Sequence, residues 1–186
     1  MHVVMAVIVI IAVWWRGYYK DWKKYHTTML YYALGNLTYN FLCANYILWR
    51  FNPDFISNHT LTEMIYTFIV FPGTILMFLG NYPKTFYKQV LHNLWWITVY
   101  VLVEVVYLIT DKIYYQYGWH LWWSAILVAV MFPMFRLHHT RPLLTYILSV
   151  PITLFLLWYF NVPVHIPMEE RVMEFFKGYY DSSFLS

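Results

Sequence analysis

The side chain best placed to do chemistry is Glu104, a carboxylate inside the apolar run of residues 92–109. That run approaches the ~20 helical residues that cross the hydrocarbon of a bilayer. Insertion scales put a central acidic residue at ~2.5–3.5 kcal/mol, so such a side chain usually faces a partner or a wet cavity. The sequence therefore predicts a membrane protein that keeps one carboxylate within the bilayer.

Other polar side chains fall near the level of Glu104 when ~1.5 Å is counted for each helical residue of each expected span. The predicted ligand-binding set is Glu104, Asn40, Asn36, Tyr66, Ser124 and Thr153. Asn36 and Asn40 are one helical turn apart and share a face. Two interpretations stay open: a pocket for a small solute, or hydrogen-bonded packing in which a neutral Glu104 locks the bundle.

A second set lies in the segment RLHHTRP, and it consists of Arg136, His138, His139 and Arg141. Arginine binds phosphate oxygens as a fork and histidine is a switchable donor, so these residues predict a lipid-phosphate site. They are also the candidates for a membrane-embedded lipid-modifying enzyme. Zinc-protease HExxH, haem-attachment CxxCH and Ser/His/Asp elbow patterns are missing from the sequence, so no catalytic residue, cofactor or metal is predicted.

Composition supports the membrane class. Of 186 residues, 61% are hydrophobic and only 11% are charged, whereas soluble domains have about 25% charged residues. Aromatic residues make up 23% of the chain, and many of them lie at the ends of apolar runs, as in interfacial belts. Cys43 is the single cysteine, which excludes a disulfide within one chain. No nucleic-acid partner is expected.

The elements that must position these residues are apolar helices. The sequence predicts an all-α transmembrane bundle of about six spans, near residues 3–15, 27–49, 61–82, 92–109, 119–137 and 143–160. Residues 1–162 form the predicted bundle, and 163–186 form a tail with a short amphipathic interfacial helix after Pro167. The first span is interpreted as retained rather than cleaved. A capping-box pattern predicts Thr60 as a helix N-cap and gives Glu63 a structural role.

Orientation follows from the basic residues of the connections, which are more frequent on the cytoplasmic side. The richer set is Arg16, Lys20, Lys23, Lys24, Lys84, Lys88, Arg136 and Arg141, and the opposite connections hold Arg50 and Lys112. With six spans, this pattern predicts that both termini are extracytoplasmic.

Three stretches carry a resemblance: KYHTTMLYYALGNLTYNFLCANYILWRF, NHTLTEM with FPGTILMFLGNYP, and RLHHTRPLLTY. They resemble a family of small multi-pass membrane proteins from spore-forming Gram-positive bacteria, over residues 22–163. The resemblance implies a bacterial cytoplasmic membrane. It implies no activity and transfers no functional residue.

The leading hypothesis is a membrane protein that binds or transports a small solute or lipid through a pocket around the intramembrane carboxylate. The alternatives are the lipid-modifying enzyme and a structural or assembly subunit of a membrane complex. The expected partners are the lipid bilayer and a small solute or lipid, with a homo-oligomer or another membrane protein left open.

Overall fold

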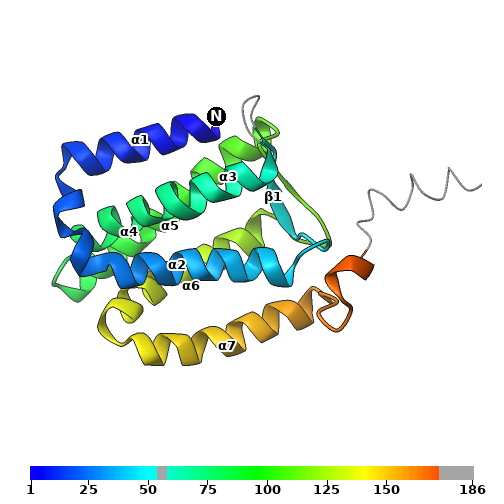
Figure 1. Cartoon of the computed structure of the whole chain (residues 1–186). Coiled ribbons are helices and arrows are strands. Elements are labelled where there is room, and N and C mark those ends of the chain that lie inside the picture. Colours follow the sequence, from blue (N-terminus) through cyan, green and yellow to red (C-terminus); the bar gives the residue numbers. More distant parts are fainter. Residues whose placement is uncertain (54–57, 172–186) are drawn as a thin grey trace, which may run out of the picture.

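The helices of the computed structural model lie side by side and run between two ends of the molecule (Figure 1). The structure describes residues 1–53 and 58–171. The α-helices are α1 (His2–Trp15), α2 (Trp22–Leu42), α3 (His59–Ile65), α4 (Phe71–Gly80), α5 (Phe86–Ile109), α6 (Leu121–Thr140) and α7 (Pro142–Tyr159). Short 3-10 helices occur at η1 (Tyr18–Asp21) and η3 (Met168–Glu170). The predicted all-α class is confirmed.

One small sheet accompanies the helices. Strand β1 (Trp49–Phe51) pairs antiparallel with β2 (Ile113–Tyr115), and Arg50 lies opposite Tyr114. The two strands belong to the connections that follow α2 and α5, so the sheet joins those connections at one end of the molecule (Figure 1).

Fewer segments meet the requirements for a span than the six expected. Within the described residues, four helical segments are long and apolar enough to cross a membrane: His59–Gly80, Phe86–Ile109, Leu121–Thr140 and Pro142–Tyr159. A fifth candidate is α1 together with η1 and α2, which are bent by 82° at the break between them. Helix α1 alone has 14 residues, about 21 Å of helix, and is shorter than a bilayer core. The candidate spans indicate a multi-pass membrane protein.

The span His59–Gly80 differs from the predicted local structure at its start. Asn58, not Thr60, is the N-cap: its side chain accepts a hydrogen bond of 2.8 Å from the backbone N–H of Leu61. The capping-box prediction is therefore wrong, and Glu63 lies one turn inside the helix. Between α3 and α4 the backbone forms a π-helical turn, η2 (Tyr66–Val70), ahead of Pro72. Such turns are rare and frequently lie at functional sites.

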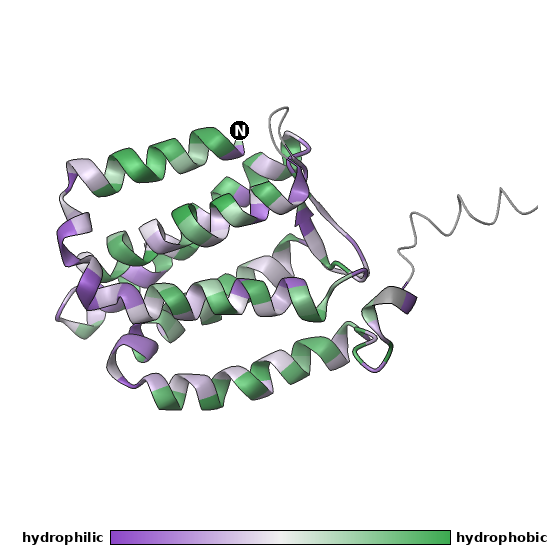
Figure 2. Cartoon of the chain, in the orientation of Figure 1, coloured by the Kyte–Doolittle hydropathy of each residue, from purple (hydrophilic) through white to green (hydrophobic). Residues whose placement is uncertain are grey.

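Burial is uneven among the helices. Helix α4 buries most of its side chains, whereas Tyr107 is the buried side chain of α5 and Thr145 that of α7. Figure 2 shows that apolar residues extend along the helices and that hydrophilic residues gather at the two ends. Apolar outer surfaces of this kind suit a bundle whose surroundings are lipid.

The two ends differ in composition. The end called here the basic end holds the connections around residues 16–24, 81–88 and 136–142, which carry most of the lysines and arginines. The N-terminus, β1 and β2 lie at the opposite end, called here the hairpin end (Figure 1). The predicted amphipathic helix of the tail lies outside the described residues beyond Arg171.

Gly73 allows α1 to approach α4 closely, because a Cβ at this position would collide with Val9. Gly73→Ala is expected to lower the stability of the purified protein by ~1–3 kcal/mol through overpacking. Gly35 has no neighbouring atom within 4 Å of the position of a Cβ, so Gly35→Ala should maintain or raise stability through its better helix propensity. Thermal unfolding of both variants in detergent tests this contrast, and equal effects would contradict it.

Candidate functional site

A buried polar cluster joins α2 to α3 and η2. Its centre is Glu63, which is 8% exposed, with Asn36 at 6% and Thr67 at 1%. The amide nitrogen of Asn36 donates to Glu63 Oε2 at 3.2 Å, and that of Asn40 donates to the same oxygen at 3.3 Å. A carboxylate within a candidate span is thus held by two neutral donors.

Every amide hydrogen of the two asparagines is used in this cluster. Asn36 also donates to Thr67 Oγ1 at 2.9 Å, and Asn40 also donates to the carbonyl of Asn36 at 3.0 Å. Thr67 in turn donates to the carbonyl of Glu63 at 2.7 Å. Glu63 Oε1 and the Oδ1 atoms of Asn36 and Asn40 have no hydrogen bond to a described residue. The unused atoms of the cluster are therefore acceptors.

His59 lies one helical turn before Glu63 and acts on it electrostatically. Its Nδ1 is enclosed and has no hydrogen-bond partner within the described part of the chain, whereas none of the three free oxygens is fully enclosed. His59 is the first residue of α3. It lies about 6 Å from Glu63 along the helix axis, on the side of the helix start.

Glu104 belongs to a separate cluster, between α5, α6 and β2. The hydroxyl of Tyr115 donates to Glu104 Oε1 at 2.6 Å, and Ser124 lies close to the carboxyl of Glu104. Ser124 also accepts from the indole N–H of Trp119 at 2.9 Å. Burial first, and Glu104 second, raise the pKa of Tyr115, so this hydroxyl keeps the proton that it donates.

Tyr66 belongs to a third cluster, at the hairpin end. Its hydroxyl lies 2.6 Å from that of Tyr107 and 3.0 Å from Nδ1 of His2. The side chain of His2 is fully buried, and its Nε2 donates to the carbonyl of Asn52 at 2.8 Å. The N-terminus of α1 is thereby attached to the β1 connection and to η2.

The predicted ligand-binding set is thus divided. Asn36 and Asn40 lie with Glu63, Ser124 lies with Glu104, and Tyr66 lies with His2. Thr153 is half-buried on α7 and forms no hydrogen bond with another described residue. The expected single polar layer around Glu104 is not present as one site.

The predicted lipid-phosphate set is also divided. His138 is 3% exposed, lies 3.1 Å from Thr28 Oγ1 and stacks on Tyr31 at 4.4 Å, so it faces the interior. Arg136 lies over the ring of Tyr82, and His139 lies beside that of Tyr25. Arg141 is exposed at the α6–α7 connection. Arg136 and His139 are one turn apart at the basic end, and His138 points away from them.

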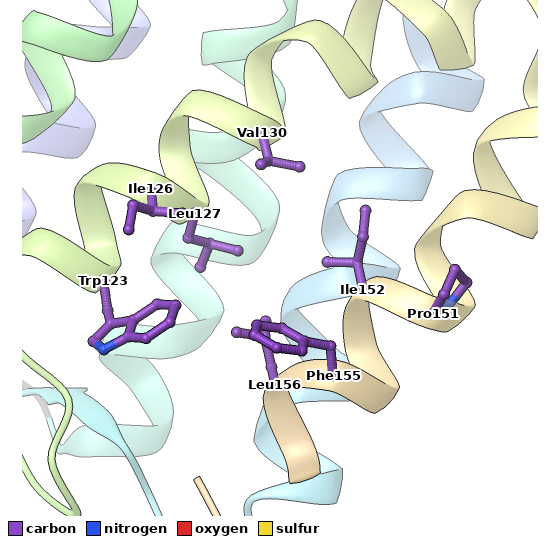
Figure 3. Close-up of a pocket in the computed structure, with 8 residues that line it drawn as sticks. All are labelled: Trp123, Ile126, Leu127, Val130, Pro151, Ile152, Phe155 and Leu156. Carbon is purple, nitrogen blue, oxygen red and sulfur yellow. The ribbon is translucent and has the colours of Figure 1, made fainter. Parts of the chain in front are cut away.

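An apolar cavity with a volume of about 340 Å³ lies between α6 and α7 (Figure 3). Its wall on α6 consists of Trp123, Ile126, Leu127 and Val130, and its wall on α7 of Pro151, Ile152, Phe155 and Leu156. None of the predicted ligand-binding or lipid-phosphate residues lines this cavity. Within the same residues, no group of three or more His, Cys, Asp or Glu side chains could hold a metal ion.

No protein-family model, no curated protein and no solved structure matches this chain. The resemblance to a family of small membrane proteins therefore stays a prediction.

Sequence reasoning assigned the two asparagines to the wrong carboxylate. A signal for the correct one was present, because Glu63 and Thr67 are spaced by one turn within an apolar run, as Asn36 and Asn40 are. Two such polar pairs on consecutive helices predict a mutual contact. The capping-box pattern instead favoured a structural role for Glu63 at the helix start and did not indicate this contact.

The contact between Tyr115 and Glu104 makes a prediction for alkaline pH. The folded protein binds the Tyr115 proton more tightly than the unfolded chain, whose tyrosines titrate near pH ~10. The stability gained from this group is therefore present below about pH 10 and is lost as the pH rises further. Tyr115→Phe should lower stability by about 1 kcal/mol near neutral pH, and its deficit relative to the wild type should shrink above about pH 10.

Thermal unfolding in detergent, scanned from about pH 8 to about pH 11, measures this deficit. Tyr87→Phe is the matched control, since Tyr87 is 69% exposed. A deficit for Tyr115→Phe that is the same across the whole scan would contradict the prediction.

Proposed function

We propose that this multi-pass membrane protein binds a small monovalent cation, a proton or an alkali ion, at Glu63. The observation that supports the proposal is the division of hydrogen bonds in the cluster. Both amide groups donate to Glu63 or to its neighbours, and within the described residues the acceptors without a hydrogen bond are Glu63 Oε1 and the Oδ1 atoms of Asn36 and Asn40. Oxygen acceptors around a carboxylate attract hard cations and protons.

The size of the site favours an ion over an organic solute. The apolar cavity of about 340 Å³ lies between α6 and α7 and includes none of the Glu63 cluster. The polar cluster is compact, with donor-to-acceptor distances of 2.7–3.3 Å. A single carboxylate with neutral amide and hydroxyl neighbours suits one positive charge better than two.

The cost of burying a carboxylate in a bilayer supports a role beyond packing. An ionised carboxylate in a span is expensive unless it is paired. The two amides lower this cost but supply no positive charge. A bound proton or alkali ion would neutralise Glu63 and would remove this cost.

The basic end faces the cytoplasm in this proposal, by the rule that cytoplasmic connections carry more lysine and arginine. Glu63 then lies about one helical turn from the extracytoplasmic end of its span, behind His59. The ion enters from that side. The π-helical turn, which includes Thr67, allows α3 to shift relative to α4 when the site is filled. Transport of the ion across the bilayer would be a further step, in line with the transport hypothesis from the sequence.

The test uses the full chain in nanodiscs of phosphatidylcholine. Binding of Na⁺ and K⁺ is followed by tryptophan fluorescence, and protonation is followed through the carboxylic C=O band in infrared difference spectra. Glu63→Gln should abolish the protonation band and weaken ion binding at least tenfold, or ~1.4 kcal/mol. Glu104→Gln is the matched control, because that carboxyl accepts a hydrogen bond from Tyr115.

The fluorescence and infrared measurements distinguish the two possible ligands, an alkali ion and a proton. Saturable binding of Na⁺ or K⁺ that is lost in Glu63→Gln identifies an alkali ion, and a titrating carboxyl band without such binding identifies the proton. The proposal is wrong if neither signal is present in the wild type, or if Glu104→Gln removes the signal and Glu63→Gln retains it.

A further inference from the structure

Three basic side chains from α2 and α6 come together at the basic end. They are Lys24, Arg136 and His139. Arg136 and His139 are one turn apart on α6. His139 lies beside the ring of Tyr25, with centroids 5.1 Å apart, and the ammonium of Lys24 lies 5.0 Å from the centroid of the same ring. Tyr25 therefore brings Lys24 of α2 next to His139 of α6.

Aromatic rings, not carboxylates, hold these cations. The guanidinium of Arg136 lies 4.8 Å from the centroid of the Tyr82 ring. Tyr25 is 4% exposed, and its hydroxyl donates to the carbonyl of Leu79 at 3.2 Å, so its ring is fixed against α4. Cation–π contacts orient a charge without neutralising it. The positive charge of the cluster is thus kept.

Like charges are gathered here without close counter-ions. Arg136 and Lys24 both act electrostatically on His139, and Arg136 also acts on Lys24. Asp21, in η1, is the carboxylate that acts on Lys24. None of the three side chains forms a salt bridge with a carboxylate of the described residues. Mutual repulsion within such a cluster is relieved by a bound anion.

We propose that Lys24, Arg136 and His139 bind the phosphate group of an anionic phospholipid. Arg136 supplies the planar fork that fits two phosphate oxygens, and Lys24 supplies an exposed point charge. Lys24 is absent from the set that the sequence suggested, because only the fold brings α2 beside this part of α6. His138, which belongs to that set, takes no part.

The position of the cluster indicates a lipid as the source of the phosphate. It lies at the end of α6, a candidate span, where the headgroups of a bilayer would be. Below Lys24, the same helix exposes Leu30 and Leu34, which are 62% and 53% exposed. Acyl chains of a lipid bound at Lys24 can cover these leucines. A zwitterionic lipid carries its own cation and gains less from the positive charges of Lys24 and Arg136, so the site should prefer anionic headgroups.

The experiment measures lipid binding to the full-length protein by native mass spectrometry from mild detergent. Phosphatidylglycerol and phosphatidylcholine with the same acyl chains are the two probes. Phosphatidylglycerol should bind about tenfold more tightly, and the preference should weaken as salt is raised. Arg136→Gln and Lys24→Gln should each reduce binding of phosphatidylglycerol severalfold, and Arg136→Lys should retain part of it because it keeps the charge and loses the fork.

Lys88→Gln is the matched control, since Lys88 lies in the first turn of α5 at the same end and makes no cation–π contact with a described ring. It removes the same charge and should leave the lipid preference unchanged. Lys24 is exposed, so Lys24→Gln still tests the site if Arg136→Gln does not fold.

Three outcomes would overturn the proposal. The first is equal binding of the two lipids. The second is an equal loss in Lys88→Gln and Arg136→Gln, which would indicate a general attraction to the basic end. The third is displacement of phosphatidylglycerol by millimolar inorganic phosphate, which would identify a free anion as the ligand. None of these results bears on Glu63, which lies toward the opposite end of the bundle.

Discussion

A polar group within a membrane-spanning bundle must find its partner inside the protein, because the hydrocarbon offers none. The contact of Glu63 with Asn36 and Asn40 meets this constraint and at the same time joins α2 to α3. Thr67 extends the contact to the carbonyl of Glu63, just where the π-helical turn begins. The packing of the α3–α4 span against α2 thus depends on the group that is most expensive to bury.

The apolar runs were sufficient to predict the helical class, and most of the helices lie within a few residues of their expected positions. The spacing of Asn36 and Asn40 predicted that they share a face, and both donate to Glu63. Counting residues predicted a depth for Glu104, but it did not predict the neighbour of each helix. Helix α2 packs on α4, and α5 packs on α6, so Glu104 meets Ser124 and the asparagines meet Glu63. Helix adjacency is a property of the whole bundle and is not encoded in any one run.

At both ends of the molecule, charged groups are held by uncharged partners. At Glu63 a negative group is held by neutral amides, and at the basic end positive groups are held by aromatic faces. An internal ion pair would satisfy each charge and leave nothing for a ligand. Neutral partners fix the position of the charge and preserve its field. A chain with only 11% charged residues thereby keeps several of its charges available to bind a ligand.

Helix α7 illustrates how polar contacts determine where a bundle is open. Near its middle it is held by the hydroxyl of Tyr31, 2.8 Å from Ser149 Oγ, and near the hairpin end Phe160, just beyond its last turn, packs on Trp119. Between these contacts α6 and α7 separate and form the apolar cavity, beginning at Pro151. Proline removes a helical hydrogen bond and favours a bend. Because the cavity walls are apolar, acyl chains can fill it without loss of a hydrogen bond, so the gap is tolerated in a bilayer where it would be costly in water.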